Sequence, residues 1–249
     1  MCKYFLVVIL VFINVFCFAQ ELSLAPSITK THSQPADNAI ISKKKAKVKN
    51  HENDFSGGFK EGKTMPDFTL YTADGKELTL SKVLKETKKP VLLVSGSCTC
   101  PIFRSNITLL NSMVAEYDGR LNIYVVYTME AHPEKGNEPY VNVPYAKKLN
   151  EKENIHISQA TTYLERRKAV DTLNKYFHVD AKILLDDPNN DWWSNSGCTA
   201  NNAYLVDTTG LIVAKNPWFN ATLKPGSMWC YIDRLLGITP ARCSKLDTL

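Results

Sequence analysis

The sequence has little that would mark a membrane protein or a nucleic-acid-binding protein. After residue 19 no segment approaches the roughly 20 consecutive apolar residues that a membrane-spanning helix needs. The net charge is only +5 at pH 7, and much of the basic excess is a lysine run between residues 43 and 49. No aromatic residues interleave with these lysines, which favours a solvated tail over a nucleic-acid or anionic-membrane surface. Internal repeats are absent too, so one globular domain with appendages remains.

The one long apolar run stands at the start of the chain. Met1-Cys2-Lys3 supplies a charged beginning, and an apolar run covers residues 4–18. This pattern is typical of a secretory signal peptide, so we expect residues 1–19 to be cleaved off and the protein to be exported, either periplasmic or secreted. The run is short for a membrane anchor. The bulky Phe16 argues against a lipoprotein anchor at Cys17.

Export changes what the cysteines imply. Two of the seven cysteines leave with the signal peptide, and five remain: Cys98, Cys100, Cys198, Cys230 and Cys243. Because five is odd, in an oxidising compartment at least one thiol stays free, pairs transiently or bonds another molecule. Cys230 and Cys243 lie in and just after the last predicted helix, and we expect them to form a structural disulfide that contributes about 3 kcal/mol.

The rest of the chain predicts one folded domain behind a polar leader. Residues 20–62 are rich in Ser, Thr, Asn, Lys and Gly without sustained periodicity, so we expect a flexible leader before a domain over residues 63–249. Apolar periodicity and turn signals give the elements of that domain. They are strands over 65–70 and 76–80, a short helix from 81, a strand over 91–94, a helix over 102–117, a strand over 121–127, a long loop over 129–158, a helix over 162–177, a strand over 182–185, a turn over 187–193, strands over 203–206 and 211–214, and a helix over 227–236.

This element order predicts an α/β fold. The strands over 91–94 and 121–127, with the helix between them, form a βαβ unit with parallel strands and a right-handed crossover. The last two strands form an antiparallel hairpin before the final helix. A parallel half followed by such a hairpin and a C-terminal helix is typical of a thioredoxin-like three-layer sandwich with a mixed sheet.

The segment Gly96-Ser97-Cys98-Thr99-Cys100-Pro101 lies where a buried strand ends and an amphipathic helix begins. The first N–H groups of a helix have no intrahelical partners, and with the helix dipole they favour a negative charge beside them. A free cysteine has a pKa of about 8.5, and a helix interaction of up to about 2 kcal/mol lowers a pKa by roughly 1.5 units. We therefore expect Cys100 to ionise readily and to act as a nucleophile.

Together with Tyr127-Thr128-Met129-Glu130-Ala131-His132-Pro133, this segment resembles the iodothyronine deiodinases and their bacterial relatives in the thioredoxin superfamily. A weaker match continues through Gln159 and residues 164–167, 204–207 and 216–220. The resemblance places Cys100 where vertebrate members carry selenocysteine and Cys98 at a cysteine of the family. It also implies that Glu130 and His132 are the catalytic pair, with His132 as acid or base and Glu130 orienting it.

The chain departs from the family at two substrate-binding positions. Iodothyronine-binding members carry a His after the glutamine that matches Gln159, and an Arg just before the hairpin strand. Here Ala160 and Asn202 stand at those positions. His156 is a candidate substitute for the first, so His156 and Asn202 are the candidate substrate-binding residues. The resemblance therefore supports the nucleophile better than it supports an iodothyronine substrate.

A second thiol is needed to resolve an intermediate on Cys100. The pair C-x-x-C is absent because Phe103 occupies the second position, which leaves Cys98 and Cys198 as candidates. Cys198 reads equally well as a buried small hydrophobe. A metal site built from Cys98, Cys100 and His132 lacks a fourth ligand and fits no common zinc spacing. The aromatic residues Trp192, Trp193, Trp218, Phe219 and Trp229 are candidates for a substrate groove, although such residues more often cover a core.

The sequence thus predicts an exported thiol oxidoreductase whose Cys100 thiolate attacks a disulfide, a peroxide or a related substrate. It predicts a small-molecule or protein-thiol substrate and an external thiol reductant, with no cofactor, no nucleic acid and no stable membrane span after signal cleavage. One alternative is a reductive dehalogenase that acts on haloaromatic or iodothyronine-like compounds. The other is a non-catalytic binding module, which predicts a Cys100 that is unreactive or locked in a disulfide.

Overall fold

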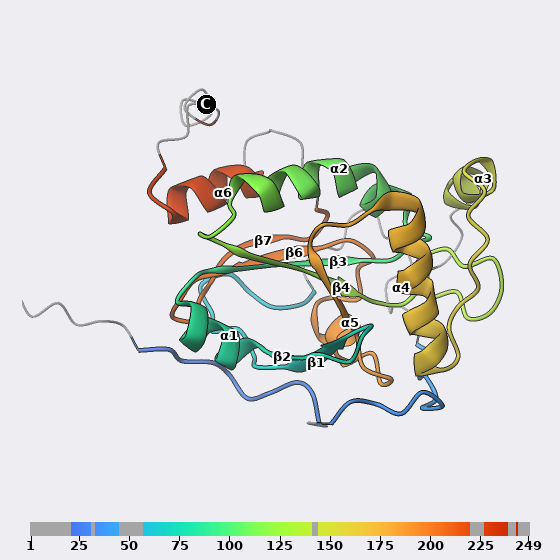
Figure 1. Ribbon diagram of the computed structural model, residues 1–249, viewed down its shortest axis with the longest axis horizontal. Helices are drawn as coiled ribbons and strands as arrows, with labels where there is room; N and C mark the ends of the chain where they lie inside the picture. The colour runs from blue at the N-terminus through green and yellow to red at the C-terminus, as the bar shows by residue number, and fades with distance from the viewer. Residues whose placement is uncertain are drawn as a thin grey trace, which may run out of the picture.

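A computed structural model of the chain contains one mixed sheet (Figure 1). Its strands are rich in β-branched, aromatic and leucine residues, which favour this conformation. Its strands are β1 (Thr69–Thr72), β2 (Glu77–Thr79), β3 (Val91–Gly96), β4 (Asn122–Tyr127), β5 (Lys182–Leu185), β6 (Ala203–Val206) and β7 (Ile212–Asn216). They lie in the order β2-β1-β5-β4-β3-β6-β7. The central pairs β3·β4 and β4·β5 are parallel, and the pairs β3·β6 and β6·β7 are antiparallel.

The structure describes residues 21–30, 33–44, 57–140, 144–219, 227–238 and 243. The predicted signal peptide over residues 1–19 lies outside the described residues, as do three lysines of the basic run, Lys45, Lys47 and Lys49. None of the helices in the described ranges combines eighteen or more residues with the apolar composition of a membrane span.

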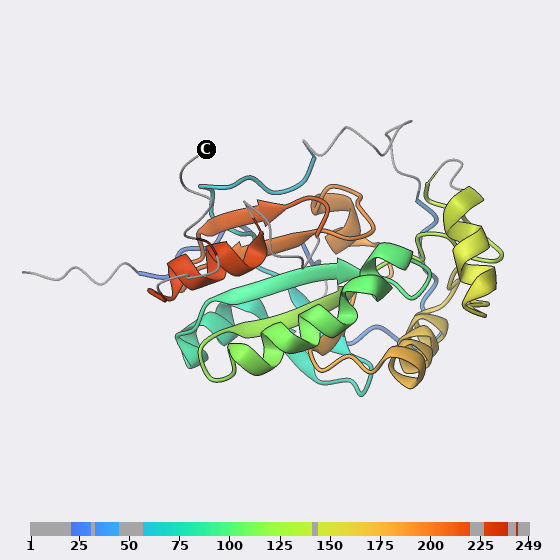
Figure 2. The ribbon, with the colours of Figure 1, turned by 90° about the horizontal axis from the view of Figure 1, so that it is seen from above.

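Helices cover both faces of the sheet and make three layers (Figures 1 and 2). They are α1 (Leu80–Thr87), α2 (Pro101–Glu116), α3 (Pro144–Lys152), α4 (Tyr163–Phe177), α5 (Asp191–Asn195) and α6 (Met228–Leu235). Apolar side chains of α2, α4 and α6 share one buried cluster with the sheet, and α1 packs in a second cluster with other strand residues. The β3-α2-β4 unit followed by the β6-β7 hairpin and α6 is the thioredoxin-like arrangement that the sequence predicts.

The predicted loop over residues 129–158 is wrong in one part, because residues 144–152 form α3. Periodicity missed this helix because it buries one small side chain and one polar side chain, Ala146 and Asn150, instead of an apolar stripe. Pro144 stands at its first position, where a missing N–H costs nothing.

Parts of the predicted flexible leader lie against the domain. Ala25 forms a parallel bridge with Pro66, and Ile40 an antiparallel bridge with Thr162. The side chain of Ile41 is buried. The two bridges rest on backbone hydrogen bonds, which any polar segment can make, so composition alone did not reveal them.

Candidate active site

The cysteine motif forms the turn between β3 and α2. Pro101 is the first residue of α2, one residue before the predicted start of this helix, so Cys100 is its N-cap residue. Gly96 ends β3, and a side chain there would collide with the ring of Phe103, which is why this close approach needs glycine. Phe103 therefore packs in the core, at the position where a C-x-x-C pair would carry its second cysteine.

Burial decides the ionisation of both cysteines in this turn. The Cys98 residue is fully buried and Cys100 is 2% exposed. Burial raises the pKa of the Cys98 thiol to about 12 and that of the Cys100 thiol to about 11. The N–H groups of Phe103 and Ile102 act in the opposite direction on Cys100, without closing a side-chain capping hydrogen bond. In this conformation burial therefore opposes the effect of the helix terminus and disfavours the Cys100 thiolate, so the expectation that Cys100 ionises readily stays a prediction.

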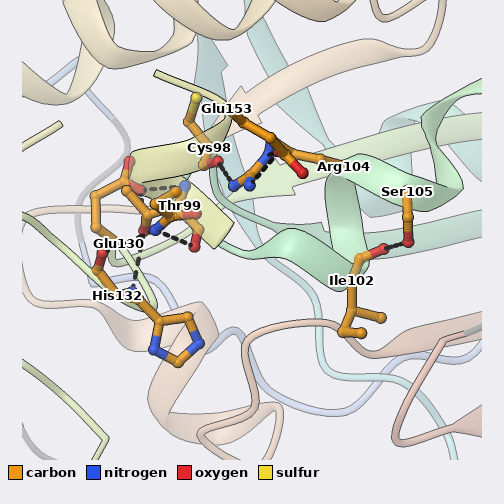
Figure 3. A network of polar contacts seen from close by, with 9 residues as sticks. Cys98, Thr99, Ile102, Arg104, Ser105, Glu130, His132 and Glu153 are labelled. Carbon is orange, nitrogen blue, oxygen red and sulfur yellow. Dashed lines mark hydrogen bonds and ion pairs between the residues drawn. The ribbon is translucent and has the colours of Figure 1, made fainter. Parts of the chain in front are cut away.

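Glu130 joins the two family motifs through buried hydrogen bonds (Figure 3). Its Oε2 accepts from the Thr99 N–H at 2.9 Å and from the Thr99 hydroxyl at 2.6 Å. Its Oε1 accepts from the Tyr127 hydroxyl, which in turn accepts from the N–H of Cys98 at 3.2 Å. Burial raises the pKa of Glu130. The carboxyl group thus fixes the backbone of the cysteine turn from the end of the neighbouring strand.

His132 is held differently from the expectation. Its backbone N–H donates to the Thr99 hydroxyl at 3.0 Å, and its imidazole extends away from the Glu130 contacts (Figure 3). The ring lies beside Tyr140, with centroids 6.2 Å apart. Glu130 therefore positions the backbone of His132 through Thr99, whereas the sequence predicts that it orients the imidazole itself.

Two polar side chains that sequence reasoning missed fix the loop after β4. Gln159 accepts from the N–H of Glu130 at 2.9 Å and donates to its carbonyl at 3.1 Å. Asn150 of α3 donates to the carbonyls of Thr99 at 3.1 Å and of His132 at 3.2 Å. The sequence marks Gln159 only as part of the family match, and Asn150 lies in the helix that periodicity missed.

Arg104 is a third missed residue, and it lies one helical turn after Cys100. Its side chain is only 2% exposed. Its guanidinium donates to the Cys98 carbonyl at 2.6 Å and to one oxygen of Glu153 at 2.6 and 3.0 Å (Figure 3). An arginine on an amphipathic helix normally faces water, so nothing in the sequence indicates its burial.

Cys198 is half-buried and lies after α5, where its N–H donates to the Trp193 carbonyl at 2.9 Å. Burial raises the pKa of Tyr140. Tyr140 and Cys100 belong to one buried apolar cluster, and Cys198 packs against that cluster. The Tyr140 hydroxyl accepts from the Trp193 indole at 3.0 Å. Cys98 and Cys100 are free cysteines, and Cys198 forms no disulfide with another described cysteine.

The remaining candidate residues lie elsewhere. Cys230 and Cys243 form a disulfide with Cα atoms 5.9 Å apart, the pairing that the sequence predicts. Trp192 and Trp193 are fully buried core residues, which argues against a groove role for this pair. Trp218 is 38% exposed.

The two candidate substrate-binding residues make polar contacts within the protein. Asn202 is fully buried, and its amide is used internally: its Oδ1 accepts from Ser95 at 2.6 Å and its Nδ2 donates to the Ser196 carbonyl at 2.8 Å. His156 is half-exposed and lies 3.3 Å from a carboxylate oxygen of Glu134. It lines an open hollow of roughly 500 Å³ that also includes Gln159.

Comparison with known proteins gives the family. The family model of iodothyronine deiodinase matches residues 2–213. The thyroxine 5-deiodinase of Rattus norvegicus is 27% identical over 103 residues, which are 40% of this chain and 34% of the relative. The human enzyme of the same name is 26% identical over the same length. The match thus spans about a third of the length of the curated relatives.

Among solved structures, a thiol-disulfide oxidoreductase from Bacteroides fragilis is 15% identical, with a TM-score of 0.42, over 62% of this chain and 90% of that chain. The family match covers both motifs of the site, including the cysteine turn and the Glu130 loop that the structure joins. The chain therefore belongs to the iodothyronine deiodinase family.

Proposed function

We propose that the protein is a thiol-dependent oxidoreductase in which Cys100 is the nucleophile. The observation that carries the proposal is the place of Cys100 as the N-cap of α2, inside the turn that Glu130 fixes. Family membership supports the same residue. The helix N-terminus stabilises a thiolate there once water or a substrate relieves its burial.

The chemistry follows from the thiols at hand. The Cys100 thiolate attacks one sulfur of a substrate disulfide, forms a mixed disulfide and releases the other sulfur as a thiolate. A second thiolate then attacks the Cys100 sulfur, which releases the reduced substrate and leaves an intramolecular disulfide. An external thiol reductant restores both thiols. With a peroxide, Cys100 becomes a sulfenic acid and one hydroxyl leaves as water, before the second thiol condenses with it.

Cys98 and Cys198 are the two proposed resolving thiols. Cys98 is two residues away, and a disulfide across so small a ring is strained and easily reduced. Cys198 is more exposed than Cys98 and packs against the apolar cluster that contains Cys100 and Tyr140. A C98S variant and a C198S variant separate them, because the variant that lacks the resolving thiol accumulates the mixed disulfide, which intact-mass spectrometry detects.

Replacement of Cys100 tests the function. Reduced C100S protein should lose dithiothreitol-dependent turnover of model disulfides and peroxides, while its circular dichroism and melting temperature stay close to wild type. C198S serves as a matched cysteine-to-serine variant outside the α2 turn and should keep the first covalent step. Full turnover by C100S would exclude the proposed nucleophile.

Reductive dehalogenation is the second candidate, and family membership favours it. Here the thiolate takes the halogen as a sulfenyl halide, the ring carbon accepts a proton, and the second thiol forms a disulfide as halide leaves. Ala160 and the internally bonded Asn202 give no side chain for the family's substrate contacts. Halide release from haloaromatic compounds by the reduced protein distinguishes this activity from disulfide reduction.

Export is part of the proposal. It is supported by the signal-like residues 1–19 and by the Cys230–Cys243 disulfide, because such bonds persist mainly in oxidising compartments. The mature protein should begin at Gln20 when it is purified from its native host, and N-terminal sequencing checks this.

A further inference from the structure

A buried positive charge lies directly beside the cysteine turn. Arg104 is packed with its guanidinium over the ring of Phe177, 5.7 Å from the centroid, and its side chain is 2% exposed. A charged side chain this deeply buried is uncommon, and it requires full pairing.

The guanidinium bridges two elements of the site. Nη1 donates to the carbonyl of Cys98 at 2.6 Å, while Nη2 and Nε donate to Oε2 of Glu153 at 2.6 and 3.0 Å (Figure 3). The Arg104 N–H also donates to the Cys100 carbonyl at 3.1 Å in the first turn of α2. The Arg104 side chain thus holds the backbone of Cys98, which lies between β3 and Cys100, and links it to Glu153 at the end of α3.

The two charges of this ion pair are unequally exposed. Glu153 keeps 44% of its side-chain surface exposed, so water screens the carboxylate but not the guanidinium. A buried cation with a half-exposed counterion leaves part of its positive field directed at the neighbouring thiols. Of the charged groups near them, Glu130 opposes ionisation of both thiols and Arg104 favours it.

We propose that Arg104 is a positioning residue of the cysteine motif, which fixes the Cys98 carbonyl and supplies the positive charge that stabilises the thiolates of Cys98 and Cys100. Glu153 sets how much of that charge the thiols feel. This inference rests on the proposed function only for its biological meaning, because the effect is measured on the thiols themselves. The charged groups that act on both thiols are Arg104 and Glu130. The titratable groups around them are Tyr127, whose hydroxyl accepts from the Cys98 N–H, and Tyr140, which packs in the cluster of both cysteines with His132 beside it.

Two variants of the ion pair separate charge from packing, because charge predicts opposite signs. R104M removes the cation and keeps a chain of similar length, so Cys100 should react with iodoacetamide about tenfold more slowly at pH 8, equal to one pKa unit. E153Q keeps an acceptor for Arg104 but removes the counter-charge, so Cys100 should react faster. R104K keeps the charge without the planar fork and should stay closer to wild type than R104M.

The measurement is the pH–rate profile of alkylation at each cysteine of the reduced full-length protein, read by peptide mass spectrometry. Amide hydrogen exchange over residues 98–104 in the same buffers corrects for local opening. R120M is the control, since Arg120 is an exposed arginine that lies over Tyr117 beyond the other end of α2. It should leave the Cys100 profile unchanged.

Each outcome decides the proposal. A slower R104M with a faster E153Q supports it, whatever the turnover of the protein. If both variants react faster, Arg104 contributes only to packing. If neither differs from R120M, its charge does not affect the thiols. Either result overturns the inference. Loss of the proposed function would appear separately, as full turnover in C100S.

Discussion

Replacing Tyr140 with alanine should convert Cys100 from a protected thiol into a reactive one. Tyr140 is 4% exposed and packs in the same apolar cluster as Cys100. Desolvation is the largest cause of the raised Cys100 pKa. Removing the ring admits water to the sulfur and leaves the helix N-terminus in place, so the pKa should fall.

The magnitude follows from the pKa values. With a pKa of about 11 the thiolate fraction of Cys100 at pH 7 is about 10⁻⁴. If water brings the pKa back to the ordinary value of 9.0, the fraction becomes about 10⁻². Y140A should therefore raise the alkylation rate of Cys100 at pH 7 about 100-fold.

The assay is iodoacetamide alkylation of the reduced protein between pH 6 and pH 10, resolved by cysteine through peptide mass spectrometry. Y140F is the matched control, because it keeps the ring and loses only the acceptor for Trp193. Since Tyr→Ala in a core costs about 3 to 5 kcal/mol, Y140L provides a smaller cavity if Y140A fails to fold.

Two results would refute the reasoning. A wild-type profile that levels off below pH 8.5 would mean that the helix terminus outweighs burial in the resting protein. Equal rates in Y140A, Y140L and Y140F would mean that the ring does not shield the sulfur. A rate that rises only with the ring's removal supports a nucleophile that is uncovered when a substrate arrives.

The other predictions concern the stability of the fold and the contact between the leader and the loop after β4. C243S opens the Cys243 disulfide and should lower the free energy of unfolding by about 3 kcal/mol in a denaturant titration without reductant; an unchanged midpoint would contradict it. Burial and then Asp186 raise the pKa of Asp187 to about 7 from 3.8, so the folded state holds this proton longer. Stability should therefore fall as pH rises from 4 through 7, and D187N should flatten the melting temperature over that range. N137A removes the bond from the Asn137 amide to the Lys44 carbonyl, 2.8 Å in the structure, which is worth about 1 kcal/mol. Cys100 alkylation should then become about fivefold faster by local opening, and an unchanged rate would show that the leader does not restrain the loop.

The sheet was predictable because its central strands are continuous apolar runs. Val91–Gly96 and Asn122–Tyr127 pair in parallel along their whole length, as a βαβ unit requires. That pairing brings the turn after the first strand and the loop after the second to one edge. The proximity of Cys100 and Glu130 is therefore a consequence of the topology that the sequence predicts.

The residues that hold the cysteine turn in place could not be predicted from the sequence. Thr99, Asn150 and Arg104 act through hydrogen bonds to backbone atoms, and such bonds leave no periodic signature in the sequence. Arg104 is the clearest case, since charge on a helix indicates a solvent-facing position until the burial is known. The same holds for the leader, whose described residues add bridges to the domain through backbone groups.

The reactivity of Cys100 depends on a balance that the motif alone cannot decide. A helix N-terminus favours a thiolate by at most about 2 kcal/mol. The pKa of about 11 lies two units above 9.0, so the net effect opposes the thiolate by about 3 kcal/mol even with the N–H groups of α2 in place. Burial therefore outweighs the helix terminus, and Cys100 shares its apolar cluster with residues remote from the motif, including Met129, Ala131 and Tyr140 on the loop after β4. A thiol buried this way resists adventitious oxidation. The reactivity of this thiol then depends on the contacts that hold the loop after β4 and α3 to the cysteine turn. These are the contacts of Thr99, Asn150 and Arg104.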